Sequence, residues 1–207
     1  MISIKQFNTE KLDHNSYLII EGNRAIVVDP NESMEIDRTI DEMLLQVDYI
    51  LLTHEHVDHI CGLERIREKT GGKVVANRIC SKNIQHVATN LSNITDMLAY
   101  FKTGTVSEER SPTFTCREAE IVFDSSYELE WQNHKFRFQF VPGHSPGSVL
   151  IWLDEKSIFS GDYLLEGEEE PLLRLRGGSA EDYETYSRSI IEGVPTGVRI
   201  YPGHGNI

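Results

Sequence analysis

The chain has 207 residues, of which 39% are apolar, and its 33 acidic and 20 basic side chains give a formal net charge of −13. This length and this apolar content suit a single domain over residues 1–207 with a sizeable core. The negative charge would repel a phosphate backbone, so nucleic acid is not an expected partner.

Antiparallel strands are predicted for the first 30 residues. Gly22 and Asn23 form a hairpin signal between two runs that are rich in β-branched and apolar side chains. The predicted strands span residues 3–7, 16–20 and 25–29.

A helix and a buried strand follow this hairpin. Ser33 suits an N-cap, and the apolar residues behind it repeat at helical spacing as far as Leu44. Residues 47–53 are apolar without alternation, which indicates a strand that is buried on both faces. Helical spacing resumes at Ile60 behind the next polar loop, and a further strand is predicted at residues 73–77.

The middle of the chain has a different character. Residues 78–120 are mostly polar and rich in turn residues, so we predict an insertion of helix and loop there. Beyond it we predict two hairpins, with strands at residues 127–131, 135–141, 148–153 and 157–162. A helix at residues 179–191 and a last strand from about Val198 are predicted to follow. Two half-chains of strands closed by helices predict an α+β fold, with two sheets face to face and helices outside.

Seven possible metal ligands follow predicted strands. Residues 53–59 read THEHVDH and hold four of them, and each of the others stands beside a glycine after a later strand. The seven are His54, His56, Asp58, His59, His144, Asp162 and His204. Imidazole and carboxylate are the usual ligands of zinc and similar metals, and strand ends collect loops into sites. The isolated histidines His14, His86 and His134 are interpreted as surface residues.

One cation is not expected to take all four ligands of residues 53–59. In an extended segment, alternation puts His54, His56 and Asp58 on one side and His59 on the other. The helical zinc motif HExxH is excluded, because Asp58 stands where its second histidine would be.

The order of these motifs resembles that of the metallo-β-lactamase superfamily, in particular its glyoxalase II-like hydrolases. The resemblance covers nearly the whole chain, and its motifs are HxHxDH at 54–59, Gly-His at 143–144, Gly-Asp at 161–162 and Gly-His at 203–204. It implies a four-layer αββα sandwich with a dinuclear site at one edge. It also implies that His54, His56 and His144 hold one metal, that Asp58, His59 and His204 hold the other, and that Asp162 bridges the two.

The resemblance further implies a hydrolase with two divalent cations, zinc in the first place, with iron or manganese as alternatives. Two cations lower the pKa of a shared water from near 16 toward about 7, and Asp58 would orient the bridging hydroxide as the catalytic residue. The expected substrate is a small thioester, ester or lactone. The alternative is a non-haem iron oxidoreductase of the same superfamily, similar to a persulfide dioxygenase.

Four residues near these motifs have two interpretations each. Asp29 is either a partner for the free N–H of a ligating imidazole or a turn residue. Cys61 is a possible thiolate ligand, but a small buried side chain is the preferred interpretation. Arg174 and Arg176 would clamp a substrate carboxylate or carry plain surface charge.

The remaining expectations concern partners and compartment. Cys61, Cys80 and Cys116 are too few for a disulfide framework, and no run of about 18 apolar residues or basic leader occurs. We therefore expect a cytoplasmic protein without a membrane partner, whose oligomeric state stays open. Since the chain stops three residues after His204, the helical domain with which glyoxalase II grips glutathione is not expected. Residues 78–120 are instead expected to form much of the substrate pocket.

Overall fold

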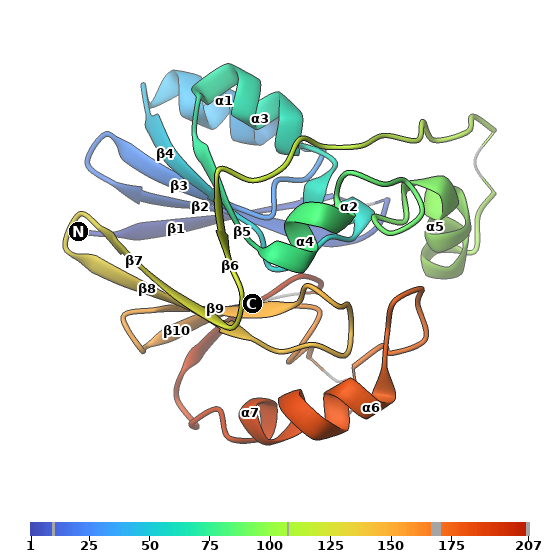
Figure 1. Ribbon diagram of the computed structural model, residues 1–207. Coiled ribbons are helices and arrows are strands. Elements are labelled where there is room, and N and C mark those ends of the chain that lie inside the picture. Colours follow the sequence, from blue (N-terminus) through green and yellow to red (C-terminus); the bar gives the residue numbers. More distant parts are fainter. Residues whose placement is uncertain (10, 107, 167–170, 206–207) are drawn as a thin grey trace.

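Two β-sheets face each other in the computed structural model, which describes residues 1–9, 11–106, 108–166 and 171–205 (Figure 1). The first sheet is mixed, with antiparallel pairs at its start and parallel pairs from β3 onward. Its strand order is β1 (Ser3–Thr9), β2 (His14–Glu21), β3 (Arg24–Val28), β4 (Gln46–Leu51), β5 (Lys73–Asn77) and β6 (Ile121–Phe123).

The second sheet is antiparallel except for its last pair, because β11 runs parallel to β10. Its strand order is β11 (Arg199–Pro202), β10 (Ser157–Gly161), β9 (Val149–Leu153), β8 (His134–Phe140) and β7 (Ser126–Trp131). This arrangement points the carboxyl ends of β8, β10 and β11 to the same edge.

Each sheet has two apolar faces, because successive side chains of a strand point to opposite sides. In β4, Ile50 packs in the cluster outside the first sheet, whereas Leu51 packs in the cluster between the two sheets. In β8, Phe136 and Phe138 also point between the sheets, and Arg137 points outward over the ring of Trp152 at 4.7 Å. Three apolar layers therefore separate four layers of structure.

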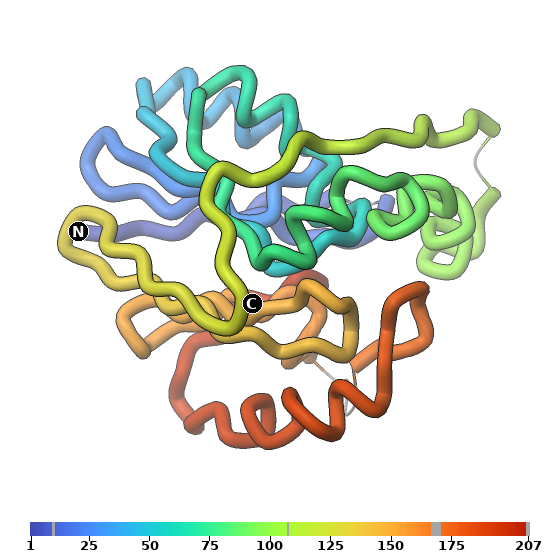
Figure 2. Tube along the Cα trace, viewed as in Figure 1, coloured from blue at the N-terminus to red at the C-terminus, as the bar shows by residue number. Residues whose placement is uncertain are grey.

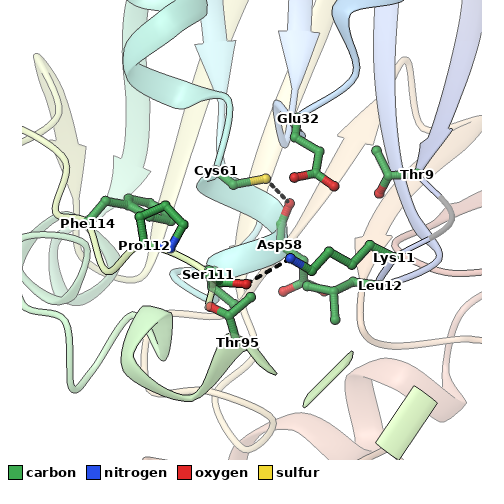
Figure 3. A pocket seen from close by; sticks show the side chains of 11 residues that line it. Thr9, Lys11, Leu12, Glu32, Asp58, Cys61, Thr95, Ser111, Pro112 and Phe114 are labelled. Carbon is green, nitrogen blue, oxygen red and sulfur yellow. Dashed lines mark hydrogen bonds between the residues drawn. The ribbon is translucent and has the colours of Figure 1, made fainter. Parts of the chain in front are cut away.

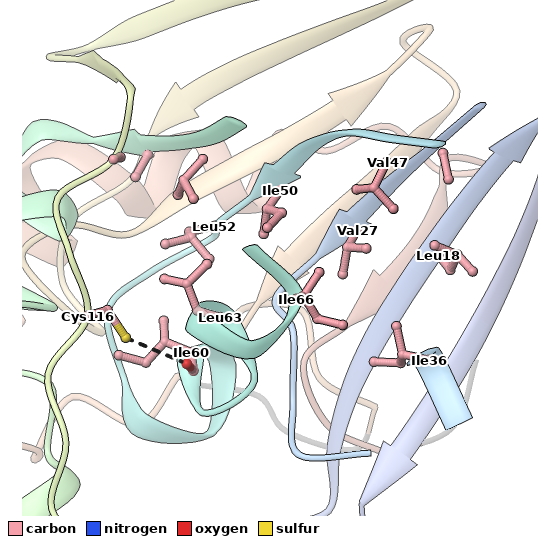
Figure 4. Packing of buried hydrophobic residues seen from close by; sticks show 14 of the residues in the cluster. Leu18, Val27, Ile36, Val47, Ile50, Leu52, Ile60, Leu63, Ile66 and Cys116 are labelled. Atoms are coloured by element: carbon pink, nitrogen blue, oxygen red, sulfur yellow. Dashed lines mark hydrogen bonds between the residues drawn. The ribbon is translucent and has the colours of Figure 1, made fainter. Parts of the chain in front are cut away.

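Helices cover both outer faces and complete the predicted αββα sandwich (Figure 1). Figure 4 shows the helical side chains of Ile36, Ile60, Leu63 and Ile66 packed on the first sheet. The helices on this side are α1 (Met34–Glu42), α2 (Val57–Ile60) and α3 (Leu63–Thr70). The second sheet is covered by α6 (Ala180–Asp182), a π-helical turn (Tyr183–Ser187) and α7 (Arg188–Glu192).

The predicted insertion contains α4 (Arg78–Asn83), a 3-10 turn (Ser92–Ile94) and α5 (Thr95–Thr103). From residue 108 the chain takes an extended path back to the first sheet, as Figure 2 shows. In the part of the chain that the structure describes, no helix combines the length and the apolar character needed to span a bilayer.

Two details of the predicted elements are wrong. The helix after Ser33 ends at Glu42, and Leu44 has a φ of 50° and is 84% exposed, so its apolar side chain does not continue the helical face. β6 was not predicted, because three residues carry too little pattern and the strand is defined by its pairing with β5. Ser33 does cap α1, since its side chain accepts a hydrogen bond from the N–H of Glu35.

Gly62 marks a close approach between the start of α3 and the segment that follows β3. Its N–H donates to the carbonyl of Pro30 at 2.8 Å, and a Cβ at this position would lie 2.0 Å from the carbonyl oxygen of Asn31. No side chain fits there without moving one of the two backbones. Because α2 immediately precedes Gly62, this contact also positions the cluster at residues 53–59.

We expect Gly62→Ala to lower the free energy of unfolding by about 3 kcal/mol, because a methyl group must displace backbone. Urea denaturation measures this change. Gly22→Ala is the matched control: its φ is 62° and nothing lies within 4 Å of the added Cβ, so only the left-handed strain of about 1 kcal/mol remains. Equal losses for the two variants would contradict the close-approach interpretation.

Candidate metal centre

The seven side chains singled out from the sequence lie together at one edge of the sandwich. They follow β4 in the first sheet and β8, β10 and β11 in the second. Backbone hydrogen bonds join the two sheets at this edge: the N–H of Asn15 donates to Gly203 at 2.7 Å, and that of Val149 donates to Thr53 at 2.9 Å. Segments far apart in the chain are thus held side by side.

One group of possible ligands comprises His54, His56, His144 and Asp162, whose ligand atoms all lie within 4.8 Å of one another. Nε2 of His144 is 2.9 Å from Nδ1 of His56 and 3.1 Å from Oδ2 of Asp162. His54, His56 and His144 are fully or almost fully buried.

A second group comprises Asp58, His59 and His204. Oδ2 of Asp58 is 3.3 Å from Nε2 of His204 and 3.9 Å from Nε2 of His59. The other oxygen of Asp162 faces this group, since Oδ1 lies 3.0 Å from Nε2 of His59 and 3.3 Å from Nε2 of His204. Asp162 therefore stands between the groups, with one oxygen toward each.

The alternation argument of the sequence analysis is wrong for Asp58. The chain is extended only as far as His56, which is the N-cap of α2, so Asp58 and His59 lie in the first turn of a helix. Both side chains then point to the second group, while His54 and His56 point to the first. The division into two groups agrees with the one that the resemblance implied.

The donor atoms fit cations. Ligand atoms on one tetrahedral zinc, each about 2.0 to 2.2 Å from it, are roughly 3.3 Å from one another, and the contacts given above are comparable. Nε2 of His59 and Oδ1 of Asp162 approach closely, yet neither atom has a hydrogen-bond partner among the residues that the structure describes. Nε2 of His54 and Nε2 of His56 are likewise buried without one. Buried polar atoms are rarely left unpaired, so this concentration of donor atoms fits the binding of a cation.

Metals bind neutral imidazole and ionised carboxylate, and His56 and Asp58 are held in these forms by their surroundings. Burial, reinforced by His144, lowers the pKa of His56 to about 3. Burial alone would raise the pKa of Asp58, but His59 and His204 outweigh it and hold that pKa below its usual range. Burial would lower the pKa of His59, but Asp162, Asp58 and Asp29 raise it to about 10, so a cation at this position takes the place of a proton.

In three histidines, the ring nitrogen Nδ1, which is not the possible metal ligand, lies beside an oxygen acceptor. Nδ1 of His59 lies 2.9 Å from Oδ2 of Asp29, Nδ1 of His144 lies 2.8 Å from the carbonyl of Leu172, and Nδ1 of His204 lies 3.0 Å from that of Asp13. An oxygen acceptor keeps the proton on Nδ1 and leaves Nε2 free as a ligand. Asp29 thus has the partner role proposed from the sequence.

Sequence reasoning missed Glu55, which lies between two of the histidines but points the other way. It is buried, and its carboxylate accepts hydrogen bonds from Asn83 Nδ2 at 2.7 Å and from Ser145 Oγ at 2.9 Å. Glu55 therefore ties α4 and the loop of His144 to the cluster. The available signal was the alternation of side chains in an extended segment, which points Glu55 to the side opposite His54 and His56.

His14 is not a surface residue, so that prediction was wrong. It is fully buried at the start of β2, where it forms a β-bridge with His204. Its ring centroid is 4.0 Å from that of His59, and within the described part of the chain neither of its nitrogens has a hydrogen-bond partner. Burial, and then the charge of His59, hold the pKa of His14 well below its usual value. His86 is exposed as predicted, and His134 is half-buried beside Asp154.

The glycine before His204 is required by crowding. A Cβ at Gly203 would lie 2.7 Å from Oδ1 of Asp162 and 2.8 Å from Cε1 of His59. The absence of a side chain at Gly203 therefore lets the backbone that follows β11 pass directly beside the possible ligands.

Two cavities adjoin the site and share Leu12 and Asp58 in their walls. The smaller, of about 180 Å³, lies beside Cys61 and Lys11 (Figure 3). Cys61 donates to the carbonyl of Asp58 at 3.5 Å, and burial raises the pKa of its thiol, as suits a buried side chain rather than a thiolate ligand. The larger, of about 390 Å³, opens onto His56, Asp58, Asp162 and His204.

Comparison with known proteins adds sequence relatives. The model of the family described as the metallo-beta-lactamase superfamily matches residues 9–204. The chain is 28% identical over 193 residues to a probable metallo-hydrolase, YqgX, of Bacillus subtilis, which covers 92% of this chain and 84% of that protein. It is 40% identical over 190 residues to a hydroxyacylglutathione hydrolase of Klebsiella pneumoniae, covering 91% of this chain and 59% of that protein.

A solved structure shares the whole architecture. The crystal structure of the BLEG-1 B3 metallo-beta-lactamase matches with a TM-score of 0.81 and 26% identity, covering 99% of this chain and 92% of that chain. The four-layer arrangement predicted from the sequence is thereby confirmed.

Asp29→Asn should weaken zinc binding by about 10- to 100-fold, because an amide removes the charge that fixes the orientation and basicity of His59. Asparagine tolerates the φ of 47° at this position, so the backbone should stay in place. Competition with a chromophoric chelator measures the affinity. Asp48→Asn is the control, since Asp48 is also largely buried but bonds to Arg24 and Trp131. Unchanged affinity in Asp29→Asn would contradict the assigned role.

Proposed function

This chain belongs to the metallo-beta-lactamase superfamily, and we propose that it is a dinuclear metal-dependent hydrolase that cleaves a small thioester, ester or lactone. The observation that carries the proposal is the position of Asp162. One of its oxygens faces His144 at 3.1 Å and the other faces His59 at 3.0 Å. A carboxylate with this placement is suited to bridge two cations and to offset part of their mutual repulsion.

The residues that would hold the cations are those of the two groups. His54, His56 and His144 would hold one, and Asp58, His59 and His204 would hold the other, with Asp162 shared. When bound, two such cations supply an acidified water near neutral pH and polarise the carbonyl that it attacks. No serine or cysteine nucleophile is then required.

Asp58 would be the catalytic residue among the protein's own groups. Its carboxylate lines the larger cavity, within reach of a substrate, and lies 3.3 Å from Nε2 of His204. Because His59 and His204 hold its pKa below the usual range, Asp58 is ionised and can accept a hydrogen bond from the attacking water. It can then carry the proton toward the leaving group.

The relatives support hydrolysis of an acyl bond. The Bacillus protein is named a probable metallo-hydrolase, and the Klebsiella protein is named for hydrolysis of hydroxyacylglutathione, which is a thioester. Because the chain spans 59% of that second protein, the thioester class is part of the proposal and glutathione is not.

Zinc is the proposed metal, since three histidines with a carboxylate suit it, with iron or manganese as alternatives. The oxidoreductase alternative uses a single iron and fewer of these ligands. A second complete group of possible ligands beside the first favours the hydrolase. The three cysteines are unpaired, which supports the proposed cytoplasmic location.

Protein purified without added metal should contain two zinc ions per chain. Removal of the metal with a chelator should abolish ester and thioester hydrolysis, and added zinc should restore it. Elemental analysis and rate measurements on the same samples test both statements. One iron per chain, with oxygen consumption and no hydrolysis, would favour the oxidoreductase instead.

Asp162→Asn should lower the metal content from two per chain toward one and slow hydrolysis on the order of a hundredfold, because the amide carries no charge and has one good ligand oxygen. Metal analysis and thermal melts are run in parallel. Asp154→Asn controls for loss of an aspartate, since Asp154 binds His134 and the N–H of Lys135 away from the site. Full metal occupancy with normal turnover in Asp162→Asn would remove Asp162 from the centre.

A further inference from the structure

The larger cavity is apolar on the walls that face away from the possible ligands. One apolar wall comes from the segment that we predicted to form the substrate pocket, and the other comes from the loop after β10. These walls contain Leu91, Leu98 and Phe101 on the first side and Leu165, Leu172 and Leu175 on the second. A volume of about 390 Å³ lies within the range of small-molecule sites.

We propose that this cavity binds an aliphatic acyl chain, so that the substrate is an ester or thioester of a medium-length fatty acid. The inference rests on the proposed function, because the reacting carbonyl must lie beside Asp58 and Asp162 at the polar end of the cavity. The chain would extend from there between the two leucine-rich walls.

The charges around the cavity favour an uncharged chain over a substrate with a distal carboxylate. Lys102 is the single basic side chain among the described residues that line it, apart from the histidine ligands, and its Nζ is paired with Asp13 at 3.0 Å. Leu172 and Leu175 point into the cavity wall, whereas Arg174 and Arg176 are exposed and do not line it. The carboxylate clamp considered for these arginines is therefore not supported by their positions.

Apolar side chains that are exposed at the cavity would be covered by a bound acyl chain. Phe101 is 75% exposed and Leu172 is 48% exposed, although both line the cavity. Apolar side chains gathered around one opening are typical of a binding site, and covering them releases about 25 cal/mol for each Å² removed from water.

The apolar wall on α5 is held in place by the turn between β1 and β2. Lys11 donates to Ser111 Oγ at 2.8 Å, and the N–H of Ser111 donates to Asp96 at 3.0 Å. Together with the pair of Lys102 and Asp13, these contacts fix both ends of α5 relative to the possible ligands. The cavity is therefore largely formed before a substrate arrives, which lowers the entropy lost on binding.

The test is a series of N-acetylcysteamine thioesters with acetyl, butanoyl, hexanoyl and octanoyl groups, assayed with zinc-loaded protein. Each fully buried methylene contributes about 0.8 kcal/mol, so kcat/KM should rise about fourfold per methylene until the cavity is filled. Phe101→Ser and Leu172→Ser should each reduce the ratio of the octanoyl to the acetyl rate by about tenfold. Both residues are exposed, so neither change should prevent folding.

Met97→Ser is the matched control, because Met97 lies on α5, is 47% exposed and does not line the cavity. It should keep the wild-type ratio. Turnover that is independent of chain length, or a ratio lowered equally by Met97→Ser, would overturn the acyl-chain proposal and leave the hydrolase intact.

Direct binding separates the two proposals. Octanoate and acetate share a carboxylate head, so calorimetry on zinc-loaded protein reports the contribution of the chain. Octanoate should bind at least about tenfold more tightly than acetate, and Phe101→Ser should narrow this difference. That result without hydrolysis of any thioester, ester or lactone would retain the acyl-chain site and reject the hydrolase. Equal binding of the two acids would reject the site.

Discussion

The candidate metal centre depends on the hydrogen bonds that the Asp29 carboxylate accepts. Asp29 stands directly after β3, where its backbone N–H donates to Leu51 at the end of β4. Its two oxygens accept from the N–H of Thr53 at 2.8 Å and from Thr53 Oγ1 at 2.5 Å, and the second also faces His59. One buried side chain thus joins two parallel strands to the first turn of α2. Thr53 Oγ1 in turn lies 3.1 Å from Nδ1 of His54 and 3.5 Å from Nδ1 of His59, so these contacts also relate two histidines that belong to different groups.

The second sheet contributes its possible ligands because three of its strands end at the same edge. β8, β10 and β11 run in one direction, so His144, Asp162 and His204 arrive together, and the contact of Asn15 with Gly203 docks them on the first sheet. Burial of so many ionisable groups is costly unless their charges are compensated. The carboxylates and imidazoles compensate one another in part, and the two cations that we propose would complete the balance.

Much of this was predictable from local pattern. Strand ends, glycine-flanked ligands and the cap at Ser33 are encoded by neighbouring residues, and the family resemblance was confirmed by the match over residues 9–204. Two of the failures result from contacts that are distant in sequence. His14 is buried by its bridge to His204, and β6 exists through its pairing with β5. The start of α2 at Val57 replaced an extended segment with a helix, which redirected Asp58.

The turn between β1 and β2 contacts both the candidate metal site and the insertion that lines the larger cavity. The backbone carbonyl of Asp13 holds His204, and its side chain holds Lys102 on α5, while Lys11 holds Ser111. Substitutions that reshape the proposed substrate pocket would therefore also disturb a residue that orients a possible metal ligand. We expect changes of substrate range to be accompanied by compensating changes in residues 11–13.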